Sequence, residues 1–268
     1  GHNGIITEVG FHPQNLYAYS KSNDGTTRIW DILSIESNAL SRFPITEREL
    51  GIAGLSEDTQ ELYVSFNNQS ISRWNVETSE EVFGVRFVTG TQNVVAFNPV
   101  LPMAFVATTE SAELWDLTTG TFIHRFDFNA PGRITNAQFS KDGSALLITD
   151  TNMNVYSTET FELLHMVSGQ GVAADINGEF LTYSTGSSIV VYDLFQNTNI
   201  CTNTNTNGPV TDVAFSPAGD RVIASIGEPA NKLLLIDSRF CRQQYEMLGH
   251  TDAVNSVAFS PNGFLAVS

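Results

Sequence analysis

Hydrophobic and polar positions follow a strand-like pattern along most of the chain. Near the end, Val254, Val257 and Phe259 are separated from Leu265 by a Pro-Asn-Gly turn. The apolar run at residues 233–236 is bounded by polar residues and has the length of a buried strand rather than of a helix. No segment shows a useful helical period, and the content of Thr, Val, Ile, Phe and Tyr favours pleated sheets. The pattern therefore predicts an all-β fold of many short strands.

Two landmarks repeat along the whole chain. The first is an aromatic or aliphatic residue followed by a small polar one, and it recurs at intervals of 36 to 44 residues. Its six copies are Trp30-Asp31, Trp74-Asn75, Trp115-Asp116, Tyr156-Ser157, Tyr192-Asp193 and Ile236-Asp237. The second is a turn segment upstream of each pair, as in Phe139-Ser140-Lys141-Asp142-Gly143 and Phe215-Ser216-Pro217-Ala218-Gly219. Each repeat unit has room for about four short strands.

The repeats resemble those of the WD-repeat β-propellers. The resemblance is strongest in the first repeat, GHNGIITEVGFHP followed by LYAYSKSNDGTTRIWD, and in the last, GHTDAVNSVAFSPNGFLAVS. Both contain a Gly-His pair, Gly1-His2 and Gly249-His250. Each histidine stands nine residues before the phenylalanine of the second landmark, Phe11 or Phe259. The second to sixth repeats lack this Gly-His pair. The resemblance covers residues 1–268 and implies one propeller domain of four-stranded antiparallel blades, seven in the intact protein.

In such propellers a histidine, a strand hydroxyl, a turn aspartate and the tryptophan are joined by hydrogen bonds that lock a blade. The matching residues of the first repeat are His2, Ser20, Asp24 and Trp30. We assign the same structural role to Trp74, Trp115 and His250. An alternative is that His2 and Asp24 form an acid–base pair. A complete buried network favours the structural role, because each polar group in it is satisfied.

The positions of the chain ends within the repeat predict an incomplete ring. The final residue, Ser268, matches Ser20, and Gly1-His2 opens at the loop into an innermost strand. The chain thus contains six repeats and half of a seventh. We expect a propeller truncated at both ends of the ring closure, as in a piece of a longer polypeptide, with an unpaired strand edge.

Composition narrows the classes of partner. The chain has 268 residues, 41% of them hydrophobic, and 29 acidic against 13 basic side chains give a net charge of -16. This charge argues against nucleic acid or an anionic membrane surface as a partner. No apolar run has the ~18 residues that a membrane-spanning helix needs.

The sequence carries no motif of a known catalytic or cofactor site, such as a phosphate-binding glycine loop or a Gly-x-Ser-x-Gly elbow. We expect no catalytic residue, no cofactor and no metal. His124 and His165 lie one repeat apart on outer strands, which diverge, so edge histidines are favoured over a shared metal. The same argument applies to Cys201 and Cys241, near the start of outer strands, and we expect no disulfide between them.

One segment is unusually acidic. From Asp142 to Asp220 the chain has nine carboxylates and no lysine or arginine. A solubilising surface is the plainer interpretation. The sharper hypothesis is that these carboxylates share a face that docks a basic protein segment.

We therefore expect a non-catalytic scaffold that binds a protein or peptide partner, with a basic partner as one option. The alternative is a propeller enzyme or ligand-binding sensor with its site in the central channel. The resemblance implies binding at the loops that enter innermost strands and at the turns before third strands. The residues at these places are Asn3, Asn23, Asn67, Glu110, Asn152, Ser187, Glu228 and Asp252.

Overall fold

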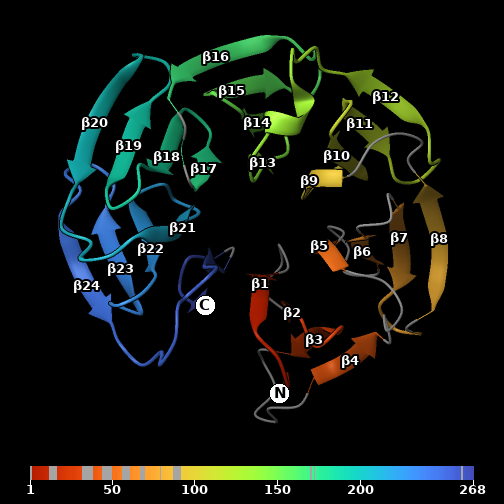
Figure 1. Cartoon of the computed structure of the whole chain (residues 1–268), viewed down its shortest axis with the longest axis horizontal. Helices are drawn as coiled ribbons and strands as arrows, with labels where there is room; N and C mark the ends of the chain where they lie inside the picture. Colours follow the sequence, from red (N-terminus) through yellow and green to blue (C-terminus); the bar gives the residue numbers. More distant parts are fainter. Residues whose placement is uncertain are drawn as a thin grey trace.

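The computed structural model describes residues 2–11, 17–31, 39–43, 50–55, 61–66, 70–78, 80–86, 92–169, 171, 173–260 and 262–268. In these residues the strands form six four-stranded antiparallel sheets and one two-stranded sheet. Figure 1 shows the sheets as blades around a common centre, with the first strand of each blade innermost. The all-β propeller with four-stranded antiparallel blades is therefore confirmed.

The first three blades contain β1 to β12. Blade 1 consists of β1 (Ile6–Phe11), β2 (Tyr17–Ser22), β3 (Thr27–Asp31) and β4 (Ala39–Phe43). Blade 2 consists of β5 (Leu50–Leu55), β6 (Glu61–Phe66), β7 (Ser70–Asn75) and β8 (Glu81–Arg86). Blade 3 consists of β9 (Gln92–Phe97), β10 (Met103–Thr108), β11 (Ala112–Asp116) and β12 (Phe122–Arg125), and a 3₁₀ turn, η1 (Pro131–Arg133), follows it.

The next three blades contain β13 to β24. Blade 4 consists of β13 (Asn136–Phe139), β14 (Ala145–Thr149), β15 (Asn152–Ser157) and β16 (Leu163–Ser168). Blade 5 consists of β17 (Ala174–Asn177), β18 (Phe180–Ser184), β19 (Ile189–Asp193) and β20 (Thr198–Asn203). Blade 6 consists of β21 (Val210–Phe215), β22 (Arg221–Ile226), β23 (Lys232–Asp237) and β24 (Gln243–Met247).

A two-stranded sheet occupies a seventh position in the ring. It consists of β25 (Ala258–Phe259) and β26 (Ala266–Val267). β25 contacts both β21 of blade 6 and β1 of blade 1, and Figure 1 shows the end of the chain beside β1. The last repeat of the sequence therefore lies between the last and the first four-stranded blades.

The small polar residue of the first landmark closes the turn between the third and fourth strands. Asp116 Oδ1 accepts hydrogen bonds from the backbone N–H groups of Thr118 and Thr119, both at 2.8 Å. Asp237 accepts from the two equivalent N–H groups of its own turn, and Ser157 does so through its hydroxyl oxygen. Asp, Asn and Ser all favour such turns because their short side chains carry an acceptor oxygen. This explains which residues occupy the landmark.

The same turns end on a residue with positive φ. The values are 70° for Gly120, 61° for Phe161, 54° for Asn197 and 50° for Cys241. In each blade the fourth strand then resumes pairing through a register shift. The backbone geometry of this position is therefore common to blades 3 to 6 although its residue type is not.

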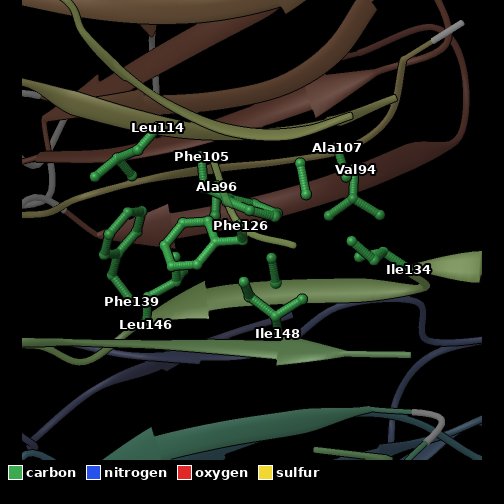
Figure 2. Packing of buried hydrophobic residues seen from close by; sticks show 12 residues of the cluster. Val94, Ala96, Phe105, Ala107, Leu114, Phe126, Ile134, Phe139, Leu146 and Ile148 are labelled. Carbon is green, nitrogen blue, oxygen red and sulfur yellow. The ribbon is translucent and has the colours of Figure 1, made fainter. Parts of the chain in front are cut away.

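The hydrophobic cores lie between neighbouring blades. Between blades 3 and 4, Phe105 and Leu114 on one side face Phe139 and Ile148 on the other, all at most 5% exposed (Figure 2). Phe126, in the loop that joins the two blades, packs edge-on against Phe105 with ring centroids 5.9 Å apart. Burial of each such side chain contributes about 2–3 kcal/mol, so each blade is stabilised mainly by its neighbours.

A disulfide joins blade 5 to blade 6, and our expectation that Cys201 and Cys241 remain unpaired was wrong. Their Cα atoms are 5.6 Å apart and the two sulfurs are bonded. The expectation placed both cysteines near the start of diverging outer strands. Only Cys201 lies within an outer strand, β20 of blade 5. Cys241 is the positive-φ residue of the turn between β23 and β24 in blade 6, and it is 4% exposed there.

The same inter-blade contact occurs between blades 3 and 4 with different residues. His124 pairs with Leu114 as Cys201 pairs with Val191, so the two residues hold equivalent strand positions. The His124 ring stacks on Phe161, the positive-φ residue of blade 4, with centroids 4.5 Å apart and planes at 14°. His124 is thus a packing residue at a blade boundary. We call this strand-to-turn contact, His124–Phe161 and Cys201–Cys241, the outer clasp.

The described chain has no helix with the length and hydrophobicity needed to cross a bilayer.

Candidate functional site

The first repeat forms the expected type of network around a buried histidine. His2 Nε2 lies 2.8 Å from Ser20 Oγ, and Trp30 Nε1 donates to the same oxygen at 2.7 Å. His2 Nδ1 lies 3.2 Å from Asp24 Oδ2 and 3.1 Å from Thr26 Oγ1. The His2 side chain is 2% exposed. This arrangement satisfies both imidazole nitrogens and fixes the loop into β1 against the turn before β3.

Asp24 is held ionised within this network. Burial opposes its ionisation, but donors from the Thr26 hydroxyl and the Asn3 backbone N–H outweigh that effect and keep its pKa well below the usual range. The Thr26 hydroxyl donates at 2.6 Å and the Asn3 N–H at 2.8 Å. A carboxylate held by so many donors is suited to positioning a loop rather than to accepting a proton.

Of the other residues assigned a structural role, His250 repeats one contact of this network and Trp115 has a different partner. His250 Nε2 is 2.7 Å from Ser268 Oγ, which repeats the His2–Ser20 contact at the seventh position. Trp115 Nε1 donates to Glu113 Oε2 at 3.1 Å, and Glu113 also binds the Arg125 guanidinium. Trp74 is half-buried in β7. A carboxylate therefore serves the third repeat where the first uses a serine shared with histidine.

The residues that we expect to bind a partner, as far as the structure describes them, all lie at one end of the ring. Because strands alternate in direction, loops into first strands and turns between second and third strands lie at the same end. We call this end the loop face, defined by Asn3, Asn23, Glu110, Asn152, Ser187, Glu228 and Asp252. All are exposed except Asn152, which is half-buried. Asn67 lies outside the described residues.

A cavity of about 840 Å³ lies at the centre of the ring and is lined by residues of the innermost strands, and we call it the channel. A five-residue pattern recurs in its wall and ends at the phenylalanine that begins the second landmark. The two landmarks alone do not reveal this pattern. Four residues before the phenylalanine stand Thr7, Thr135, Thr211 and Asn255, and one residue later stand Glu8, Asn136, Asp212 and Ser256. The phenylalanines of three of these segments, Phe11, Phe139 and Phe259, line the channel as well.

These residues form layers at successive depths, because first strands run in the same direction in every blade. The layer of Thr and Asn side chains is nearest the loop face and is mostly exposed. The layer of Glu8, Asn136, Asp212 and Ser256 lies one residue deeper and is half-buried. We call these eight residues the channel mouth. The pattern Thr/Asn-polar-x-x-Phe, present in four repeats, is the sequence signal that would have revealed them.

Two carboxylates of the acidic segment are interior rather than part of an outer face. Asp175 is 1% exposed, accepts the Phe215 backbone N–H at 2.6 Å and accepts from Gln138 at 2.7 Å. Asp212 accepts the Val257 backbone N–H at 2.9 Å and the Ser256 hydroxyl at 3.1 Å. Each carboxylate thus links its blade to the next one.

Burial shifts the titration of both groups. Burial raises the pKa of Asp175, with Lys141 acting against the shift. Burial raises the pKa of Asp212 to about 6, opposed by the N–H donors of Val257 and Val213. The hypothesis that the whole acidic segment shares one docking face is therefore wrong for these two residues. The exposed members are Asp142, Glu159, Glu162, Glu179 and Asp220.

In the described part of the chain no group of three His, Cys, Asp or Glu side chains could hold a metal ion.

Comparison with known proteins agrees with this geometry. The family model described as WD domain, G-beta repeat, matches residues 1–31 and 241–268, where the two Gly-His pairs lie. Among solved structures, a chain of "Crystal Structure of Mitotic Checkpoint Complex" superposes with a TM-score of 0.81 at 15% identity. The match covers 98% of this chain and 85% of that one.

At that identity the likeness shows the fold alone. Solved chains that match number 1829, so the architecture is common and does not by itself select a partner. A search of curated proteins finds no match. The chain is therefore a β-propeller whose first and last repeats match the WD domain, G-beta repeat model.

Proposed function

We propose that this propeller is a non-catalytic scaffold that binds a protein or peptide partner on its loop face. The observation that carries the proposal is the way the face is built in blade 1, where the exposed side chains Asn3 and Asn23 stand on a loop and a turn that a buried network holds in place. Asp24 binds both the Asn3 N–H and the His2 ring, so the loop into β1 and the neighbouring turn are fixed together. A rigid surface loses little conformational entropy on binding. Propellers with WD repeats typically act as such scaffolds.

The partner can be identified with the intact chain. We would immobilise it, identify a protein retained from the source organism, and measure its affinity for variants. Exchange of Glu110, Ser187 and Glu228 for arginine should weaken binding at least tenfold. The matched control exchanges Glu77, Thr78 and Glu80, which are also exposed and give the same change in net charge. A partner that binds both triple variants equally well would move the interface away from the loop face.

The channel supports a second candidate, a ligand-binding sensor. Its volume of about 840 Å³ is in the range of small-molecule sites, and its wall mixes charged, polar and aromatic side chains. A screen of metabolites for a rise in melting temperature tests this candidate. Loss of the stabilisation on exchange of channel-mouth residues, with loop-face variants unaffected, would favour the sensor over the scaffold.

A further inference from the structure

The charges around the channel are unevenly matched. Three carboxylates, Glu8, Asp175 and Asp212, and two lysines, Lys21 and Lys141, lie on or next to its described wall. Lys21 Nζ is 3.9 Å from Glu8 Oε2, and the Tyr19 hydroxyl also donates to Glu8 at 3.1 Å. Lys141 is close enough to Asp175 for the two charges to shift each other's pKa. Both lysines therefore have a carboxylate partner.

Asp212 is the carboxylate of this set without a cation among the described residues. Its contacts there are N–H and O–H donors from Val213, Ser256 and Val257, and the charge that acts on it is the like charge of Asp175. Such donors satisfy its oxygens but leave its negative charge uncompensated in a half-buried place. An added positive charge at this point would be favourable.

The channel mouth can also accept hydrogen bonds from a cationic group. Its residues Thr7, Thr135 and Thr211 carry hydroxyl groups, and Asn136 and Asn255 carry amides, all of which can act as acceptors. An ammonium or guanidinium group presents donors and no acceptor, so channel-mouth oxygens can accept its hydrogen bonds while Asp212 balances its charge. A carboxylate or phosphate ligand would face Asp212 and Asp175 as like charges.

We propose that the channel mouth is a binding site for a lysine or arginine side chain of a partner protein, with Asp212 as its counter-charge. The inference rests on the proposed scaffold function in one respect, that the cation belongs to a protein. The site opens towards the loop face, so a segment bound there can extend one basic side chain into the channel. The net charge of -16 attracts such a segment over a longer range.

A consequence is that binding and protonation of Asp212 compete. The titratable groups near it are Asp175 on β17, Glu8 and Lys21 on blade 1, and Lys141 after β13. Burial raises the pKa of Asp212 to about 6, so this carboxylate loses its charge below that pH. A cation should therefore bind more tightly above that pH than below it.

The test uses the full chain and two blocked tripeptides, acetyl-Gly-Lys-Gly-amide and its norleucine analogue. Binding is followed by NMR chemical shifts or calorimetry. We expect the lysine peptide to bind the wild type at pH 7.5, and its affinity to fall about tenfold at pH 5. Asp212→Asn should give a similar loss at pH 7.5, whereas Glu77→Gln, which makes the same charge change at an exposed turn on the opposite end of the ring, should stay within twofold.

Several results would overturn the proposal. They are equal binding of the norleucine peptide, equal loss in Glu77→Gln, or an affinity of the wild type that does not change between pH 7.5 and pH 5. The last measurement needs no variant, so it decides the matter even if Asp212→Asn fails to fold. n-Butylammonium binding as tightly as the peptide would assign the site to free amines instead. A failed tripeptide assay with an intact effect of the Glu110, Ser187 and Glu228 exchanges would leave the scaffold function standing.

Discussion

Single residues in this propeller act mainly by satisfying buried donors and acceptors. Ser20 is 6% exposed and its hydroxyl meets both the His2 imidazole and the Trp30 indole. Removal of that one oxygen leaves two ring nitrogens without a partner. A buried group left in this state costs roughly 1–3 kcal/mol.

We predict that Ser20→Ala lowers the free energy of unfolding by about 2 kcal/mol, and that Trp30→Ala lowers it by about 3 kcal/mol through the added loss of packing. Urea denaturation followed by fluorescence measures both. Ser187→Ala, at an exposed serine, serves as the control and should change stability by less than about 0.5 kcal/mol. A similarly small effect of Ser20→Ala would show that the network does not stabilise blade 1.

Asp212 should make stability depend on pH in an unusual direction. Its pKa is raised to about 6 in the folded chain, against an ordinary value of 3.8. Between these two values the folded state binds more protons than the unfolded state, so stability rises as the pH falls from 7 to 4. The contribution is about 3 kcal/mol, from about 1.4 kcal/mol per pKa unit.

The measurement compares the wild type with Asp212→Asn at pH 7 and pH 4, because other carboxylates act in the opposite direction. The pKa of Asp142 is lowered by its Ser140 hydroxyl bond, and that of Asp220 by its Ser216 hydroxyl bond, so both lose stabilising contacts in acid. The difference between the two proteins should shift in favour of the wild type as the pH falls. A difference that is constant with pH would contradict the assignment.

At the scale of strands and turns, the landmarks predicted the order of elements because their residue types are required by turn geometry. Asp116, Ser157 and Asp237 each accept N–H groups of the turn that follows. The disulfide was not predicted, for the complementary reason. The position of Cys241 is defined by its backbone conformation, and residues as different as Gly120 and Phe161 share it. Spacing between cysteines carries no information about such a conformation.

The candidate site was only partly predictable in the same sense. The network around His2 follows from residue types at known spacings. The interior positions of Asp175 and Asp212 do not, because each depends on an N–H group of the next blade, at Phe215 and at Val257. Charge counted along the chain could not separate these two groups from the exposed carboxylates around them.

The disulfide should stabilise the junction of blades 5 and 6. It closes a separation of 40 residues. In the loop-closure model a bridge of that span contributes about 4 kcal/mol. We predict that the Cys201→Ser, Cys241→Ser double variant loses stability of that order, and that a reducing agent has the same effect on the wild type and none on the variant. Thermal melts with and without reductant check both statements, and identical melts for all samples would exclude a stabilising bridge.

Over the whole molecule, the five exposed carboxylates of the acidic segment lie at the end of the ring opposite the loop face. Asp142, Glu179 and Asp220 stand in turns between first and second strands, and Glu159 and Glu162 in the turn between β15 and β16. A basic partner segment that docks here would be guided by a local field rather than by net charge alone.

Two double variants distinguish a local docking field from an effect of net charge alone. Glu159 and Glu162 hold the same turn positions in blade 4 that Glu77 and Glu80 hold in blade 2, and all four are exposed. Exchange of the blade 4 pair for lysine should slow association with a basic partner several-fold at low salt, and the equivalent blade 2 exchange should have a smaller effect. Because the change in net charge is equal, identical rates for the two variants would show that the acidic segment serves only solubility.

The outer clasp has a consequence for how such a ring can change. Its two ends are set by backbone geometry, an outer-strand position and a left-handed turn residue, and the chain fills them with an aromatic stack in one place and a covalent bond in another. The same backbone positions can therefore hold different pairs of side chains, so the interaction at a blade junction can be replaced while the blades keep their places. The stability of each blade junction can therefore be changed separately, while the loops on the two ends of the ring keep their relative positions.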